Sequence, residues 1–172
     1  IGEYAFSDCT SLTSITVDEN NPVYHSAGNC IIETATKTLV AGCGASIIPA
    51  DGSVTSIGEG AFDGCTSLTS ITIPDGVTTI DGGAFSWCTS LTSINIPDSV
   101  TSIGSNAFYG CFSLTSINYG GTIEQWNAVD KSELHLVTAL GEVIDNSWNA
   151  NTGDYTIHCT DGDITKDEDI AK

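Results

Sequence analysis

The sequence of 172 residues contains no arginine, no methionine and only four lysines, against 22 aspartates and glutamates. The formal net charge is therefore −18 at pH 7. Proteins bind nucleic acid and anionic lipid mainly through lysine and arginine, so this composition predicts that the chain binds neither. No apolar run approaches the roughly 20 residues of a membrane-spanning helix, and no signal-peptide pattern is present. We therefore expect no direct membrane insertion of this chain.

Hydrophobic residues still make up 40% of the sequence, which is enough for a core. Three blocks align without gaps, beginning at Ile57, Ile80 and Ile103, so the sequence repeats with a period of 23. A fourth copy opens the sequence at the middle of a repeat, which predicts a longer parent protein with any export signal upstream. The shared apolar positions are Phe62, Phe85 and Phe108, then Cys65, Cys88 and Cys111, then Leu68, Leu91 and Leu114.

This period predicts a repeat solenoid whose coils, each one period long, are mostly β-structure with short helical turns. Each unit holds two strand-like pieces, such as 68–73 and 77–80. In the next stretch Ala84, Phe85 and Cys88 have the spacing of about one helical turn. One unit buries too little apolar surface to fold alone, so we expect stacked units to share one continuous apolar column.

The pattern I-G-x-x-A-F-x-x-C-x-S-L-T-S-I-x-I-P resembles the leucine-rich repeats of the BspA-like bacterial surface family, over residues 1–17 and 54–118. The resemblance implies an exported or surface-attached bacterial protein that serves adhesion or interaction through a rigid repeat face. Gly76 and Ser99 stand where ordinary leucine-rich repeats carry asparagine or cysteine. The usual asparagine ladder is therefore absent, and standard horseshoe curvature is not expected.

The predicted organisation is a leucine-rich-repeat solenoid over residues 1–118, followed by a C-terminal cap and tail over 119–172. An irregular β-meander insert over 18–53 interrupts the period. Gly28-Asn29 in this insert is a hairpin signal. We expect the meander to replace one coil and to bulge from the stack.

In the C-terminal segment, Thr122 and Gln125 form a capping-box pattern that predicts a helix near 123–130. Residues 155–159 have the pattern of a last strand, and 166–172 that of a frayed tail. The segment is similar to the closing segment of many BspA-like proteins, which implies that it covers the end of the solenoid.

Seven cysteines raise the question of disulfides and metals. Cys9 shares the position of the repeat cysteines, and parallel stacking points all of them the same way, so we expect a column of buried free thiols. A disulfide between Cys30 and Cys43 across the meander stays open. There is no C-x-x-C pair and no histidine in the repeats, so we expect no metal site and no cofactor.

No catalytic residue is expected either. His158 and Cys159 are adjacent on a predicted strand and so face opposite sides, which is poor geometry for a cysteine–histidine nucleophile. Asp161 and Asp163 resemble the start of a calcium loop, but Lys166 follows where the loop needs glycine. We interpret these carboxylates as solvated turn residues, with weak calcium binding as an alternative.

Polar residues flank the inward isoleucines of the strands and form rows on the outer face. Two interpretations are open: the hydroxyls and amides bond along the stack of a solvated sheet, or they form a flat recognition surface. The candidate residues are Ser70, Thr72, Ser93, Asn95, Ser116 and Asn118.

Three aromatic residues, Trp87, Tyr109 and Phe112, occupy positions where neighbouring units have small or polar residues. Stacking would bring them to one flank, where an exposed aromatic patch would mark a protein or glycan contact. The alternative is that one or more of them folds down against the cap helix and Trp126.

The function that we predict is non-enzymatic adhesion or interaction at the cell surface or outside the cell, with a protein or glycan, host-derived ones included, as partner. A passive spacer that holds another domain of a longer surface protein is the main alternative. A fragment of a carbohydrate-processing enzyme is a remote one. The open N-terminal coil also exposes apolar strand edge, which predicts self-association.

Overall fold

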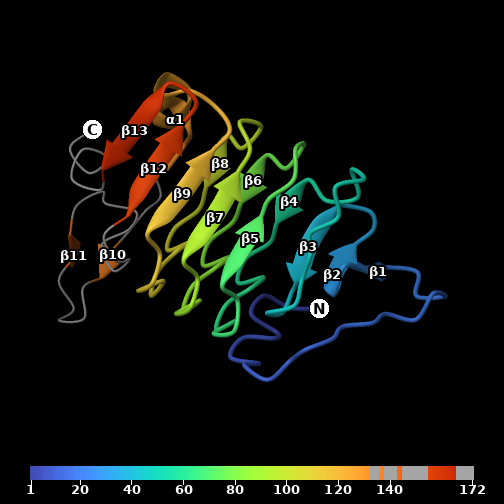
Figure 1. Cartoon of the computed structure of the whole chain (residues 1–172). Coiled ribbons are helices and arrows are strands. Elements are labelled where there is room, and N and C mark those ends of the chain that lie inside the picture. The colour runs from blue at the N-terminus through green and yellow to red at the C-terminus, as the bar shows by residue number, and fades with distance from the viewer. Residues whose placement is uncertain (132–135, 138–142, 145–154, 166–172) are drawn as a thin grey trace.

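The computed structural model describes residues 1–131, 136–137, 143–144 and 155–165, and it places the repeats side by side (Figure 1). Short strands of consecutive repeats pair in parallel and build two sheets along the stack. The first sheet contains, in spatial order, β1 (Tyr24–Ala27), β2 (Cys30–Glu33), β3 (Thr38–Ala41), β4 (Ser56–Ile57), β6 (Thr79–Ile80) and β8 (Ser102–Ile103). The second contains β13 (Gly162–Thr165), β12 (Thr156–Cys159), β9 (Ser116–Tyr119), β7 (Ser93–Ile96) and β5 (Ser70–Thr72). A separate antiparallel pair joins β10 (Leu136–Val137) and β11 (Val143–Ile144).

The strand pairing follows the sequence period. In the second sheet, Ile71 pairs with Ile94 and Ile94 with Ile117, each partner lying one period further along the chain. In the first sheet, Ile57 pairs with Ile80 in the same way. All five isoleucines are buried, because side chains alternate along a strand and only the inward set meets the core.

The third side of each repeat consists of tight turns, where the sequence predicted a short helical turn. The Cys65 N–H donates to the Phe62 carbonyl at 3.0 Å, a three-residue turn bond. Gly60 and Gly64 have φ angles of +63° and +70°, which no right-handed helix accommodates. The Phe62 N–H instead donates to the carbonyl of Ala84 in the next repeat at 2.7 Å. The predicted helical turn was wrong because these backbone bonds run between repeats.

Three phenylalanine rings form the centre of the core. Phe62 and Phe85 stack with ring centroids 5.1 Å apart and an interplanar angle of 8°, and Phe85 and Phe108 with values of 5.6 Å and 6°. Their side chains are fully buried, and the repeat leucines and inward isoleucines beside them are also buried. The predicted continuous apolar column is confirmed.

The repeat cysteines Cys65, Cys88 and Cys111 are buried free thiols, as predicted. The Cys88 thiol donates to the carbonyl of Phe62 at 3.1 Å, one repeat back. Burial raises the pKa of Cys65 and of Cys111 to about 12. Cys9 is exposed, so the prediction was wrong for the first copy, which lies at the end of the stack.

The predicted meander is present as the antiparallel strands β1, β2 and β3. Gly28 and Asn29 both have positive φ angles at its first turn, as a tight two-residue hairpin requires. Cys30 and Cys43 are both buried free thiols. The meander does not bulge from the stack, because β3 pairs in parallel with β4 and so serves as a repeat strand.

The repeat that contains β3 is shortened. Leu39 of β3 pairs with Ile57 of β4, which follows it by less than one period, whereas Ile57 pairs with Ile80 a full period later. A shorter repeat cannot follow the full outline of its neighbours, so some part of its path must lack a strand or a turn.

In the C-terminal segment, the predicted helix is confirmed as α1 (Ile123–Ala128), with both hydrogen bonds of the Thr122–Gln125 capping box in place. Trp126 is fully buried on it and packs edge-on against Tyr119, with ring centroids 5.1 Å apart. The described part of the chain contains no helix that is both long and apolar enough to cross a membrane.

The strand predicted at 155–159 is present as β12, parallel to β9, but it is not the last one. After Asp161 the chain reverses and β13 pairs with β12 in antiparallel register. The predicted tail at 166–172 lies outside the described residues.

Replacing the central ring of the stack tests the core. We expect Phe85→Ala to lower the free energy of unfolding by about 3–5 kcal/mol, because the cavity would separate two stacked rings. Urea denaturation followed by circular dichroism measures this loss. Phe112→Ala, at a side chain that is 55% exposed, is the control and should cost less than about 1 kcal/mol. Equal losses in both variants would contradict the described core.

Thiol accessibility tests the cysteine column. In the native protein at about pH 8, Ellman's reagent should react rapidly with Cys9, while Cys65, Cys88 and Cys111 should react only after denaturation. Burial raises the pKa of these three thiols and so suppresses the reactive thiolate. Because Cys159 is also partly exposed, the double variant Cys9→Ser, Cys159→Ser should lose the fast phase; a fast phase that persists in it would count against this arrangement.

Candidate functional site

The structure brings Trp87, Tyr109 and Phe112 together on the turn side of the stack. The Trp87 ring meets Tyr109 edge-on, with centroids 5.3 Å apart at 81°, and Phe112 with centroids 5.9 Å apart at 74°. Trp87 is 44% exposed and Phe112 is 55% exposed. We call these three residues the aromatic cluster. It presents ring surface to solvent in a fixed edge-to-face arrangement.

The backbone at Trp87 explains how the ring is placed. Its φ angle is +57°, and the same position in the flanking repeats is glycine, Gly64 at +70° and Gly110 at +75°. A bulky residue in the left-handed region is a true outlier. A Cβ atom on Gly110 would lie only 2.8 Å from the indole, so the missing side chain at Gly110 makes room for Trp87.

Trp87 and Phe112 are not buried against the helix α1. The aromatic residue of that helix, Trp126, packs against Tyr119 and has Lys131 Nζ 4.5 Å from its ring centroid. Trp87 and Phe112 keep about half of their surface in solvent. The aromatic cluster is therefore a surface feature of the repeats.

The six polar candidates form two rows across the outer face of the second sheet. In one row, the Asn95 amide donates to the Thr72 hydroxyl at 2.9 Å, and the Asn118 amide donates to the Asn95 amide oxygen at 2.8 Å. Strand register aligns the three serines in the other row, Ser70 with Ser93 and Ser93 with Ser116. The amides satisfy one another along the row, which is the behaviour of a self-contained sheet surface.

The amide row continues onto two residues that were not predicted to belong to it. His158 on β12 lies opposite Asn118, and Asp163 on β13 lies opposite His158. The His158 Nδ1 and Asp163 Oδ1 atoms are 2.9 Å apart. In the sequence, the alternation of Ile157 with His158 indicates that His158 faces outward. Only the pairing of β12 with β9 shows that it extends the amide row.

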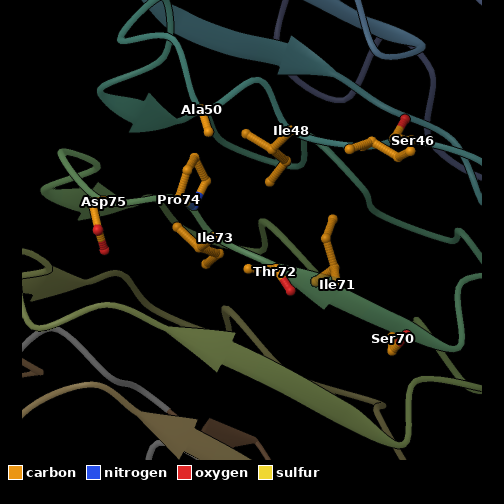
Figure 2. Close-up of a pocket in the computed structure, with 10 residues that line it drawn as sticks. Ser46, Ile48, Ala50, Ser70, Ile71, Thr72, Ile73, Pro74 and Asp75 are labelled. Atoms are coloured by element: carbon orange, nitrogen blue, oxygen red, sulfur yellow. The ribbon is translucent and has the colours of Figure 1, made fainter.

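A groove lies beside β5, and Figure 2 shows its two walls. One wall is the segment 46–50 of the shortened repeat, and the other is β5 with the residues that follow it as far as Asp75. The volume is about 540 Å³, within the range of about 300–1,000 Å³ that is typical of ligand pockets. The repeat pattern does not predict this groove, although the short spacing between β3 and β4 indicates an incomplete repeat.

The carboxylates considered for calcium point to different partners. The Asp161 side chain accepts a hydrogen bond from the Ile123 N–H at 2.8 Å, at the start of α1, and Asp163 faces His158. Within the described ranges, no group of three or more histidines, cysteines and acidic residues is arranged to hold a metal ion.

Solved structures of other bacterial leucine-rich repeat proteins are similar to this chain. A leucine-rich repeat protein from Eubacterium ventriosum ATCC 27560 is similar at a TM-score of 0.59 and 28% identity, over 69% of this chain and 33% of that one. A leucine rich cell surface protein from Faecalibacterium prausnitzii A2-165 has a TM-score of 0.48 and 28% identity, over 76% of this chain and 48% of that one. The chain thus spans between a third and a half of the length of these two relatives. Among curated proteins, none matches.

The family is defined by a repeat model. The model of the BspA type leucine rich repeat region matches residues 1–30 and 33–139, in six copies. The match includes most of the meander, in agreement with the role of β3 as a repeat strand. The resemblance inferred from the repeat pattern is confirmed, and this chain belongs to the BspA type leucine-rich repeat family.

Proposed function

We propose that the chain is a non-catalytic recognition module of a cell-surface or secreted bacterial protein, and that it binds an external protein or glycan through the aromatic cluster. The observation that carries this proposal is Trp87. A tryptophan with a left-handed backbone, 44% exposed, replaces the glycine of the flanking repeats. The fold does not require a tryptophan there, so its strain points to a role outside the fold.

The cluster has the properties of a binding anchor. Tryptophan and tyrosine dominate the energy of many interfaces because their rings offer a large contact area and lose little conformational entropy. The Trp87 N–H donates to the Tyr109 carbonyl at 2.6 Å, so the backbone between the two rings is held by the stack. A partner would meet rings that are already ordered, which lowers the cost of binding.

The architecture that supports this module is part of the proposal. We infer that residues 1–118 form a short solenoid and that 119–160 cap it. The buried Trp126 supports the cap, as does the backbone of Asp130, which pairs with Ser102 and so continues the first sheet beyond β8.

The polar rows favour a different role. Thr72, Asn95 and Asn118 satisfy one another's hydrogen-bonding groups, which supports the alternative of a passive spacer for this face of the sheet. The two roles are compatible if the rows stabilise the sheet and the aromatic cluster makes the contact. We propose no turnover for the chain, because the family to which it belongs is one of leucine-rich repeat proteins. A fragment of a carbohydrate-processing enzyme is the remote alternative.

Surface or extracellular placement rests on membership of the BspA type family and on the resemblance that it confirms. A net charge of −18 would favour partners with basic or neutral surfaces. Self-association through the first repeat stays a separate proposal, supported by the exposed Ile1 and Val23 near the end of the stack.

The proposal is tested by restoring the neighbouring repeats' residues. The triple variant Trp87→Gly, Tyr109→Ser, Phe112→Thr should lose binding while its melting temperature changes little. Each lost ring contact should lower the free energy of unfolding by about 0.5–1.5 kcal/mol. Relief of the left-handed backbone strain at Trp87 should raise it by about 1–2 kcal/mol. Wild type and variant would be screened side by side on host matrix proteins and on a glycan array.

A matched variant in the polar rows separates the two surfaces. Ser93→Ala with Asn95→Ser changes the rows and leaves the aromatic cluster intact, so binding should persist. A triple variant that binds as well as the wild type would refute the aromatic site. Loss of binding together with a large drop in melting temperature would show a structural role for the rings instead.

A further inference from the structure

We propose that the groove beside β5 binds an extended peptide segment of a partner protein, which adds to the second sheet as a further strand. The peptide would carry apolar side chains at alternate positions and a basic residue near the end of β5. This surface differs from the aromatic cluster, and the inference goes beyond the function proposed above.

The backbone of β5 has one edge without a strand partner. Among the described strands, β5 is the last of its sheet and pairs only with β7. The Ile73 N–H donates toward β7, to the Asn95 carbonyl at 2.9 Å. Neighbouring residues of a strand direct their backbone groups to opposite edges, so those of Ser70 and Thr72 face the groove. Nowhere in the described part of the chain does a residue make a backbone hydrogen bond to this edge.

The shortened repeat explains why the edge is open. The Ser46 N–H donates to the Cys43 carbonyl at 3.0 Å, as the Leu68 N–H does to the Cys65 carbonyl at 3.0 Å, so Ser46 and Leu68 are equivalent. The chain reaches Pro49 soon after Ser46, whereas the path from Leu68 to the equivalent Pro74 is twice as long. The segment is too short to form a strand along β5, and Pro49 has no N–H to donate.

The groove has the right chemistry for an extended peptide. Ile48 lies on one wall, with Ile71, Ile73 and Pro74 on the other (Figure 2). Ile47 also lines the groove and is 76% exposed, so its side chain adds apolar surface that a bound peptide could cover. Apolar walls beside an open row of backbone donors and acceptors are what strand addition requires, since the backbone supplies affinity and the side-chain pockets supply specificity.

The other strands of the sheet indicate which peptide would fit. Each neighbour in register places an isoleucine between two outward polar residues, at Ile94, Ile117 and Ile157. A strand added in the same direction would place its own apolar residue beside Ile71. Asp75 lies at the far end of the groove, and the net charge is −18, so a basic residue there is attracted and a second copy of this chain is repelled.

A short synthetic peptide provides the probe. The peptide TSITIKK repeats the sequence of residues 69–73 and adds two lysines, and fluorescence anisotropy with the labelled peptide measures its dissociation constant. In the expected register the two isoleucine N–H groups donate to β5. Methylation of both nitrogens should therefore weaken binding about tenfold or more. Equal binding of the methylated peptide would overturn the proposal, as would no binding of TSITIKK at about 1 mM.

Variants of the protein complete the test. Asp75→Lys should weaken binding several-fold, and Ile47→Ser should do so at an exposed position that the fold does not need. Asp98→Lys is the matched control, because Asp98 stands one period later at the same position of its repeat and does not line the groove. Equal losses of affinity in Asp75→Lys and Asp98→Lys would show that the peptide responds only to the net charge of the protein, and would overturn the proposed site.

Two further measurements identify the occupant. The triple variant of the aromatic cluster should bind TSITIKK as the wild type does. The peptide site is therefore tested independently of the proposed function. Light scattering before and after addition of TSITIKK measures whether the peptide dissociates a dimer of the wild type, and we expect no such dissociation. Such a dimer would show that a second copy of the chain occupies the edge, contrary to the proposal.

Discussion

Backbone hydrogen bonds between neighbouring repeats constrain the rest of the structure. They run on all three sides of a repeat: from Asp81 to Ile57 at 2.9 Å, from Ile73 to Asn95 at 2.9 Å, and from Phe62 to Ala84 at 2.7 Å. Because each bond joins equivalent stretches of two repeats, identical side chains must lie in rows. The stacked phenylalanines, the buried thiols and the polar rows are consequences of this one arrangement.

The same constraint determines how departures from the repeat appear. A changed side chain alters a row without altering the path of the backbone, as at Trp87, where the N–H still donates to the next repeat. A missing stretch of chain removes a partner from the neighbouring strand, as beside β5. Substitutions therefore produce surface patches and deletions produce open edges, and the described part of the chain contains an example of each: the aromatic cluster and the edge of β5.

Much of the fold could be predicted, because its determinants are local or periodic. The inward isoleucines follow from strand alternation, the helix α1 from the Thr122–Gln125 capping box, and the hairpin from Gly28-Asn29. The spacing of Ala84, Phe85 and Cys88 led to the wrong prediction of a helical turn, because a helix and a series of tight turns place these residues alike. The bonds that decide between them go to another repeat. The prediction that Cys9 is buried was wrong because Cys9 has the same repeat position as the other cysteines but lacks the neighbours that bury them.

The candidate surfaces divide in the same way. The sequence by itself determined which residues share a row and that Trp87, Tyr109 and Phe112 depart from it, because both follow from the period of the repeats. Only the tertiary structure decided that these rings meet on the surface and that His158 and Asp163 lengthen the amide row. It also decided that β5 is an edge strand among the described strands of its sheet. Exposure and edges depend on what lies beside a residue in space, and here that neighbour is a repeat or more away along the chain.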